Sequence, residues 1–364
     1  MVEERRHSVN RRAAPQWREM AVRTRGARAG ARWVRFDDER LLDLRFCDLG
    51  LRLEGSWLDE RMREVWAELG ARGLRLKPHV WLSTEWFSPD GVPGIALPFY
   101  LAHPRLTRLE RSRMLEVEGG SRDECLAILR HEAGHCMQHA WRLHRREAWR
   151  RLFGDSARDY PEIYRPNPAS QRFVQHLRQY YAQAHPDEDF AETFAVWLAP
   201  RSGWRRRYAD WPALRKLEYV DELMRSLREQ VPPVRSRRQV EPLAQVRRTL
   251  REHYAAKQAS YARWRPSVQD RDLQRLFAAE PGRRGEPAER FLRRNRAEIR
   301  RLVSRFTGES AFTLERTLDD VIARCGALDL RASGHERRLR VDFALLLAVR
   351  TVHFHYSRRN WVAL

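Results

Sequence analysis

The chain has 364 residues, 42% of them hydrophobic and 33% charged, which is enough for two domains with sizeable cores. Its 13 tryptophans argue against general disorder, and its four scattered cysteines contain no CxxC pair, so they indicate neither a disulfide framework nor a zinc ribbon. The 70 basic and 49 acidic residues leave a formal net charge of +21, which suggests an acidic partner such as nucleic acid.

Neither end of the chain has the pattern of a membrane or secretory segment. The longest apolar stretch near an end, residues 343–349, is too short to span a bilayer. The first 30 residues are rich in Arg and lack the apolar core of a secretory signal. We therefore expect a cytoplasmic protein without a membrane span.

The charge is unevenly distributed along the chain. Residues 1–36 carry 10 Arg and 3 Glu, a net charge of +7, whereas residues 37–234 carry 31 basic and 31 acidic groups. Residues 235–305 carry 20 basic groups and 8 acidic ones, a net charge of +12, and residues 306–364 add +2. A neutral middle is therefore flanked by basic segments.

These shifts in composition divide the chain into four predicted parts. Residues 1–35 contain Gly, Ala and Arg with little apolar periodicity, so we expect a disordered basic arm. The proline and arginine residues of 232–241 indicate a linker. Between these segments we predict a globular domain over 36–231, and after them a helical domain over 242–364.

The first regular elements after the arm are a helix and two strands. Apolar residues at helical spacing predict a helix over 57–69. Residues 79–86 and 94–102 are typical of strands, with a turn signal at 88–91 between them. Because Pro98 cannot donate to a ladder, the second strand is expected at an edge. Helical patterns dominate the remainder, which predicts an α+β fold with a small sheet and a mostly α C-terminal segment.

The next helix contains an HExxH motif. Ser121 and Glu124 form a capping box, which predicts a helix starting there. Residues four apart share a face of a helix, so the imidazoles of His131 and His135 can converge on one metal ion. Glu132 then lies beside the ion, where it can accept a proton from water. The motif therefore predicts a zinc site.

A zinc site of this kind needs a third protein ligand and an open position for water. HExxH occurs by chance in roughly a few per cent of chains, so the motif alone does not establish a zinc site. A third ligand is needed to distinguish a zinc site from a chance match. His139 continues the same helix, but it lies about 12 Å from His131 along the axis and cannot share the ion. Gly134, within the helix, costs roughly 1 kcal/mol relative to Ala, and we expect another backbone to approach closely there.

The other candidates lie on a helix predicted after His185. Pro186 suits its first position. Glu188 and Glu192 share one face of this helix, and either can be the third ligand. Another face is aromatic: Phe190, Phe194 and Trp197. An acidic pair on so aromatic a helix suggests a partner such as a metal site.

The two motifs in this order resemble the bacterial zinc-binding metallopeptidases. They resemble more distantly the gluzincins, which pair an HExxH helix with an ExFAE helix, such as anthrax lethal factor. The likeness extends over roughly residues 41–230 and includes these segments: Leu97-Pro98-Phe99-Tyr100, Leu115–Gly120 and Tyr181-x-x-x-His185-Pro186-x-Glu188-Asp189-Phe190-Ala191-Glu192-Thr193. This resemblance implies a zincin-like metallopeptidase core with an HExxH active-site helix and one Zn²⁺ per chain.

The resemblance also implies roles for individual residues. Glu188 would be the third ligand with His131 and His135. Glu192 would orient a ligand histidine by a hydrogen bond without binding the metal itself. We expect His185 to lie in the same outer layer of the site. The reverse assignment of Glu188 and Glu192 remains an alternative. Tyr181 would donate its O–H to the developing oxyanion or the leaving group, although an ordinary half-buried aromatic is an equal alternative.

The function that follows is hydrolysis of a peptide or protein substrate, with Glu132 as the general base. The strand over 94–102 could bind an extended peptide by strand addition. An alternative is a nucleic-acid-associated or protein-binding module with a structural or vestigial zinc site. Arg residues interleaved with Tyr254, Tyr261, Trp264 and Phe277 favour this alternative. A third hypothesis makes the C-terminal helices a lid over the cleft.

Overall fold

The structure is a computed structural model that describes residues 31–161, 164–263, 265–277 and 285–356. Most of the arm predicted over 1–35 lies outside these residues. Its last residues, however, form a 3₁₀ helix, η2 (Arg32–Arg35). Trp33 in this helix is buried, and its indole Nε1–H donates to the Leu49 carbonyl oxygen at 2.9 Å. Residues 32–35 are therefore part of the fold, because Trp33 belongs to the core.

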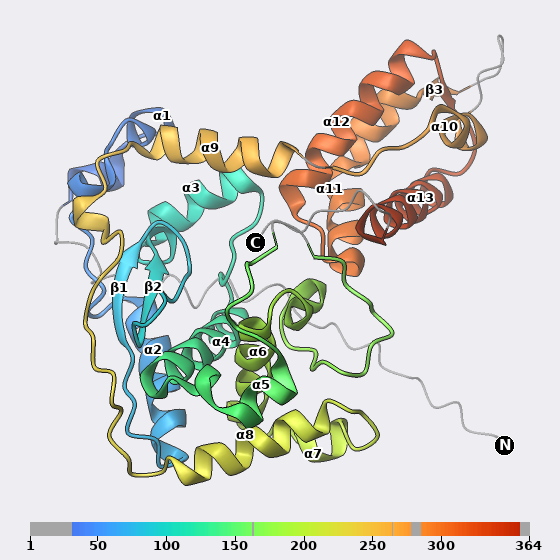
Figure 1. Ribbon diagram of the computed structural model, residues 1–364. Helices are drawn as coiled ribbons and strands as arrows, with labels where there is room; N and C mark the ends of the chain where they lie inside the picture. The colour runs from blue at the N-terminus through green and yellow to red at the C-terminus, as the bar shows by residue number, and fades with distance from the viewer. Residues whose placement is uncertain (1–30, 162–163, 264, 278–284, 357–364) are drawn as a thin grey trace, which may run out of the picture.

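The fold is mostly helical, of the α+β type, with two small two-stranded sheets among the described residues. Figure 1 shows a larger body that contains the first sheet, and a smaller group of C-terminal helices beside it. Two separate apolar clusters match these two groups. None of the described helices is long and apolar enough to cross a membrane.

The larger body contains these α-helices and strands: α1 (Asp38–Leu42), α2 (Trp57–Ala71), β1 (His79–Ser83), β2 (Gly94–Pro98), α3 (Pro104–Met114), α4 (Arg122–Trp141), α5 (Glu147–Phe153), α6 (Pro186–Leu198), α7 (Trp204–Arg207), α8 (Leu214–Ser226) and α9 (Leu250–Arg263). Its short 3₁₀ helices after η2 are η3 (Phe46–Asp48), η4 (Phe99–Leu101), η5 (Leu143–Arg145), η6 (Arg178–Gln183) and η7 (Leu243–Gln245). The helix predicted over 57–69 is confirmed as α2, where the Ser56 side chain accepts a hydrogen bond from the Asp59 N–H.

The strands are shorter than predicted and pair in parallel, with Ala96 opposite Trp81. The segment predicted as strand up to residue 102 turns into η4 directly after Pro98, which has no N–H for a ladder. The segment that connects β1 to β2 runs along the edge of β2 that faces away from β1. There the Ala96 N–H donates to the Phe87 carbonyl oxygen at 2.8 Å. A substrate strand therefore cannot use the Ala96 N–H, which weakens the hypothesis of strand addition at this edge.

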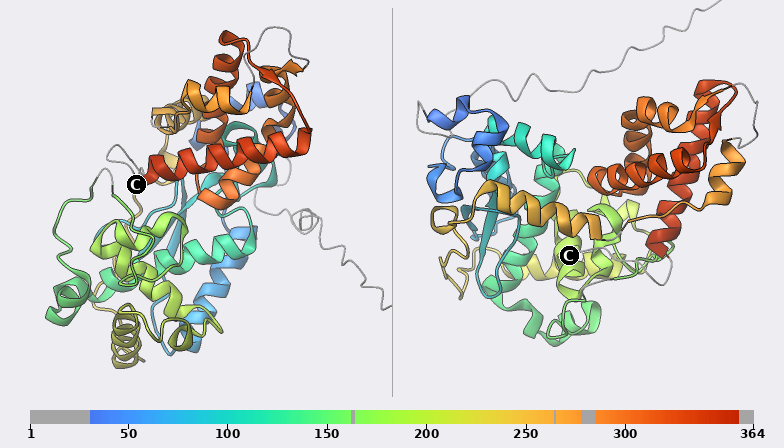
Figure 2. Two further views of the ribbon diagram at one scale, coloured as in Figure 1. Left: turned by 90° about the vertical axis from the view of Figure 1, so that its right-hand side faces the viewer. Right: turned by 90° about the horizontal axis from the view of Figure 1, so that it is seen from above.

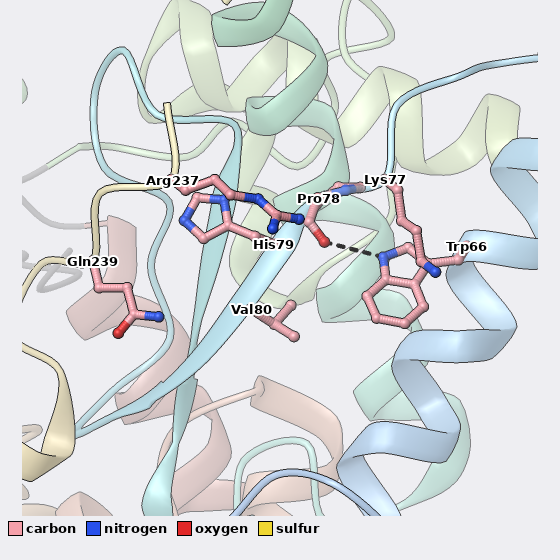
Figure 3. Close-up of a pocket in the computed structure, with 7 residues that line it drawn as sticks. All are labelled: Trp66, Lys77, Pro78, His79, Val80, Arg237 and Gln239. Carbon is pink, nitrogen blue, oxygen red and sulfur yellow. Dashed lines mark hydrogen bonds between the residues drawn. The ribbon is translucent and has the colours of Figure 1, made fainter. Parts of the chain in front are cut away.

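The segment predicted as a linker over 232–241 runs beside β1. Alternate side chains of a strand share one face, and the side chains of His79, Trp81 and Ser83 all bond to carbonyl oxygens of this segment. The three distances lie between 2.8 and 3.1 Å. Figure 3 shows the Arg237 side chain lying next to His79. Both residues line a cavity of about 390 Å³, together with Gln239 and Trp66. The segment is therefore packed on the larger body.

Helix α9 belongs to the larger body, although the sequence suggests that it begins the C-terminal helical part. Its residues Leu250 and Tyr254 are members of the first apolar cluster. The second cluster is formed by residues between 273 and 347, mainly on α10 (Asp270–Leu276), α11 (Ala288–Thr307), α12 (Ala311–Ala327), α13 (Glu336–Tyr356) and β4 (Arg331–Ala332). Strand β4 pairs with β3 (Glu286–Pro287). The apolar clusters thus divide after α9, and the two further views in Figure 2 show α9 running toward the C-terminal helices.

The turn between α11 and α12 joins the C-terminal helices to the larger body. The Gly308 carbonyl oxygen accepts a hydrogen bond from Gln179 Nε2 at 3.2 Å. The Ala311 N–H donates to Glu116 Oε1, also at 3.2 Å. Phe312, next in the chain, packs into the first apolar cluster. These contacts tie α11 and α12 to η6 and to the loop after α3.

One consequence of the packing of α9 can be measured through His253. Burial, followed by the charges of Lys257 and Arg248, lowers the pKa of His253 to about 3. The folded chain keeps this ring neutral where the unfolded chain, with a pKa near 6.5, binds a proton, so stability falls as pH falls from 6.5 toward 3. We expect His253→Gln to make this fall shallower, by up to about 1.4 kcal/mol per pH unit, in urea unfolding between pH 6.5 and 4.5.

The matched control for this measurement is His335→Gln, because His335 is exposed. That variant should keep the pH dependence of the parent chain. Parallel stability profiles for the parent chain and His253→Gln would contradict the assignment of a buried neutral imidazole.

Candidate metal centre

The site is built where α4 crosses α6. The Ser121 side chain accepts a hydrogen bond from the Glu124 N–H and starts α4, as the capping box predicts. Pro186 occupies the first turn of α6. A Cβ atom on Gly134 would lie 2.8 Å from the Cα atom of Ala191, so only glycine allows the helices this close. The predicted close approach of another backbone at Gly134 is confirmed, and the approaching backbone is that of α6.

The crossing brings His131, His135 and Glu188 together in the interior. The two Nε2 atoms are 3.0 Å apart, and Glu188 Oε2 lies 3.0 Å from His131 Nε2 and 3.3 Å from His135 Nε2. Among the described residues, these three form the one group of His, Cys, Asp and Glu whose ligand atoms lie within 4.8 Å of one another. Two ligands at about 2.0–2.1 Å from a tetrahedral zinc ion are about 3.3 Å apart, so the donor atoms fit zinc in type and spacing.

Glu192 lies behind this group. Its Oε1 accepts a hydrogen bond from His131 Nδ1 at 2.9 Å, and its Oε2 accepts one from the Leu177 N–H at 2.8 Å. An ionised carboxylate can only accept, so the proton of a neutral His131 is on Nδ1 and the lone pair on Nε2 faces the site. The geometry therefore places Glu188 with the ligand atoms and Glu192 outside them.

The charges of the group are strongly coupled. Burial by itself would lower the pKa of His131, but the hydrogen bonds and charges of Glu188 and Glu192 outweigh burial and raise it. Burial would likewise raise the pKa of Glu188, but His135 and His131 together lower it. The carboxylate of Glu188 is thus ionised at neutral pH, as a metal ligand must be.

Glu132 is buried at the same site, and its Oε2 has no hydrogen-bond partner among the described residues. A buried carboxylate oxygen without a partner is costly, so such atoms commonly mark a functional site or an ordered water or ion. The Glu132 backbone carbonyl accepts a hydrogen bond from Ser88 Oγ at 3.4 Å. This oxygen is therefore free to accept a hydrogen bond from a molecule bound at the site.

Tyr181 lies on η6 with its ring centroid 5.6 Å from that of His131. Burial, and then the charges of Glu188 and Glu132, raise the pKa of Tyr181, so its phenol stays protonated and can donate. The two residues directly before Tyr181, Gln179 and Tyr180, both have a φ of 59°. Left-handed backbone of this kind costs about 1–3 kcal/mol per residue and persists only where contacts hold it.

Tyr160 is a residue of the site that the sequence did not reveal. Its hydroxyl donates to Glu188 Oε1 at 3.0 Å, which leaves Oε2 facing the histidines. Its ring stacks on His185, with centroids 3.8 Å apart. His185 caps α6 through a hydrogen bond from the Asp187 N–H, and its Nε2–H donates to the Arg158 carbonyl oxygen. His185 therefore acts on Glu188 only through Tyr160 and the start of α6.

His139 lies outside the group, as helix geometry predicts. It is buried, and its Nδ1 accepts a hydrogen bond from the Gly91 N–H at 3.3 Å. Burial, followed by the charge of His135, lowers the pKa of His139 to about 4. The ring thus holds the turn after β1 against α4 in its neutral form.

The basic segment 235–305 differs from the surface that a nucleic-acid binder needs. Tyr254 and Phe277 are core residues, Tyr261 is 40% exposed, and Trp264 lies outside the described residues. Several arginines pair with carboxylates at 2.6 to 3.4 Å: Arg251 with Glu39 and Asp43, Arg265 with Asp320, Arg294 with Glu286 and Glu336, and Arg296 with Glu315 and Asp319. Part of this segment's positive charge is therefore paired with carboxylates of the protein itself.

Comparison with known proteins agrees with this geometry. The family described as "Putative zinc-binding metallo-peptidase" matches residues 110–203, the segment that contains α4, η6 and α6. His131, Glu132, His135, Tyr160, Tyr181, Glu188 and Glu192 all fall within that range. No curated protein and no solved structure matches the chain.

The crossing of the helices can be tested at Gly134. Gly134→Ala should destabilise the chain by about 1–3 kcal/mol in urea unfolding, because the added methyl group meets the Ala191 backbone at 2.8 Å. It should also weaken zinc binding, because Glu188 moves with α6. Gly70→Ala in α2 is the matched control: nothing lies within 4 Å of its Cβ position, and it should be neutral or stabilise by up to about 1 kcal/mol. Equal effects of the two substitutions would contradict the close crossing.

The division of roles between the two glutamates can be tested by zinc affinity. Glu192→Gln should weaken binding about 10- to 100-fold, as for a residue that orients a ligand. Glu188→Gln should weaken it further, because a donor atom is lost. Competition titration with a chromophoric chelator measures both, with the exposed Glu222→Gln as the control that keeps affinity. A larger loss for Glu192→Gln would reverse the assignment.

Proposed function

We propose that the protein is a zinc-dependent metallopeptidase of the gluzincin type with a zincin-like core, and that it binds one zinc ion per chain. The observation that carries this proposal is the convergence of two imidazole Nε2 atoms and one carboxylate oxygen beside Glu132, whose buried Oε2 has no hydrogen-bond partner among the described residues. The match of residues 110–203 to a zinc-binding metallopeptidase family supports the same reaction class.

His131, His135 and Glu188 would hold the zinc ion. When bound, zinc polarises the peptide carbonyl and lowers the pKa of water, which makes water a nucleophile near neutral pH. Glu192 holds the His131 ring through Nδ1, so the Nε2 lone pair stays directed at the site. Tyr160 holds one oxygen of Glu188, which leaves the other for the ion.

Glu132 would act as the general base and then as the general acid. Its unpaired Oε2 accepts a proton from the attacking water as the new C–O bond forms. The same proton then passes to the nitrogen of the leaving amine when the C–N bond breaks. Glu132 ends ionised, ready for another cycle.

Tyr181 would donate a hydrogen bond to the oxygen that becomes negative during attack. Its raised pKa keeps the proton on the phenol at neutral pH, and its ring lies next to His131. The left-handed residues Gln179 and Tyr180 fix where this ring is presented. Tyr181 would thus stabilise the transition state, while Glu132 moves the proton.

The decisive variant is Glu132→Gln. Zinc content per chain, measured by elemental analysis, should be unchanged, because Glu132 supplies no ligand atom. Hydrolysis of a peptide library, followed by mass spectrometry, should fall about 10²- to 10⁴-fold, because the amide cannot accept the proton. Chelation should abolish the activity of the parent chain, and added zinc should restore it.

Glu147→Gln on the exposed end of α5 is the control and should keep full activity. Full activity of Glu132→Gln would remove the proposed mechanism. Zinc binding without any zinc-dependent cleavage by the parent chain would favour a structural metal site.

A further inference from the structure

A cleft of about 550 Å³ lies between the C-terminal helices and the segment that carries Tyr181. One wall is the last half of α11, and the other is formed by η6 and the loop after α3. The polar residues that line it are Glu116, Arg178, Arg300, Arg301, Ser304 and Arg305. A cavity of this size is in the range that accommodates a small ligand or a few side chains.

The cleft is strongly basic. Arg301 and Arg305 are exposed, and neither has a carboxylate within ion-pairing distance in the described part of the chain. They lie four residues apart on α11, so their side chains point to the same side of the helix. Arg300 pairs with Glu315, and Arg178 lies 3.6 Å from Glu124. At least two guanidinium groups are therefore available for an anion.

The one carboxylate in the lining does not neutralise these arginines. Glu116 Oε1 accepts the Ala311 N–H at 3.2 Å, at the start of α12. Burial raises the pKa of Glu116 to about 6, so the group is still mostly ionised at pH 7, but its Oε1 is engaged by a backbone N–H and not by an arginine. The position of this carboxylate supports the wall of the cleft and leaves Arg301 and Arg305 unpaired.

The cleft shares a wall with the metal centre. Arg178 precedes Tyr181 by three residues, so their Cα atoms are at most about 11 Å apart. Leu177, next to Arg178, donates its N–H to Glu192, which holds His131. Gln179 bonds to Gly308 at the end of α11, which fixes the two walls relative to each other. The cleft therefore lies within the length of a few extended residues from the metal centre.

We propose that this cleft binds acidic side chains of the peptide substrate and so selects substrates with Asp or Glu a few residues from the scissile bond. This inference rests on the proposed peptidase function. Guanidinium groups form short, charge-assisted hydrogen bonds with carboxylates, often in pairs, and Arg301 and Arg305 offer two such groups on one side of a helix.

A peptide fits the observations better than a nucleic acid does. Arg301 and Arg305 lie in a cleft of limited volume next to the segment that carries Tyr181. Elsewhere in the basic segment, arginines such as Arg251, Arg294 and Arg296 are paired with carboxylates. A nucleic-acid surface would instead present free basic groups along a phosphate backbone and aromatic rings open to bases.

Binding is tested first, without catalysis. The probes are fluorescein-labelled decaglutamate, decaglutamine and a ten-nucleotide single-stranded DNA, each titrated against the full zinc-loaded chain with Glu132→Gln. Decaglutamate should bind more tightly than decaglutamine and the DNA. Arg301→Glu with Arg305→Glu should weaken decaglutamate binding at least about tenfold, and the two Gln substitutions should weaken it less.

The control carries the same change in charge at the other end of the molecule. Arg206→Glu with Arg215→Glu alters exposed residues of α7 and α8, far from α11 in Figure 1, and should change affinity about twofold or less in 0.15 M salt. Equal losses in the two double variants would overturn the proposal, because binding would then follow net charge. Tighter binding of the DNA, lost with Arg301→Glu and Arg305→Glu, would assign the cleft to nucleic acid.

Specificity is tested next with pairs of peptides from the library digest that differ only by Glu or Gln in the flanking residues. The ratio of kcat/KM for the Glu peptide over the Gln peptide should exceed about tenfold in the parent chain and approach one in Arg301→Glu with Arg305→Glu. A ratio near one in the parent chain would overturn the proposal. A lack of any hydrolysis would refute the peptidase function alone, since decaglutamate binding is measured independently.

Discussion

The close contact between α4 and α6 positions His131, His135 and Glu188, the proposed ligands of the metal centre. Gly134 and Ala191 are its closest point, and the three proposed ligands lie within one helical turn of these two residues. His131 and His135 lie three residues before and one after Gly134, and Glu188 lies three residues before Ala191. Because both helices are regular, the distance and angle of this one contact determine whether the Nε2 atoms meet a carboxylate. A methyl group at the crossing would separate donor atoms that now lie 3.0 to 3.3 Å apart.

The sequence predicted those parts of the site that depend on a helix alone. The cap at Ser121, the spacing of the two histidines and the proline at the start of α6 are local signals, and all three are confirmed as structure. The choice between Glu188 and Glu192 is different, because both share one face of α6. Only the crossing angle decides which carboxylate meets the Nε2 atoms, so the sequence could separate them by family resemblance but not by periodicity.

Other features depend on contacts between distant segments, which local patterns do not reveal. Tyr160 reaches Glu188 across 28 residues of chain, and the peptide N–H of Leu177 meets Glu192 through a loop without periodicity. The left-handed backbone at Gln179 and Tyr180 is likewise unmarked, since neither residue favours that region. The contact of Gln179 with Gly308 helps to hold it. The parallel pairing of β1 and β2 was also missed, because the return segment pairs on the far edge of β2 through Phe87.

The net charge of +21 does not describe how much positive charge is available to a ligand, because many arginines are paired with carboxylates. In residues 235–305 the charge was first a reason to consider nucleic acid, yet Arg251, Arg294 and Arg296 pair with carboxylates of the protein itself. Charges that remain unpaired matter more than the total, because a paired guanidinium has little left to offer a ligand. The helix α11 that presents Arg301 and Arg305 also ends against η6. The C-terminal helices therefore contribute both to holding the segment with Tyr181 and to the electrostatic field beside it.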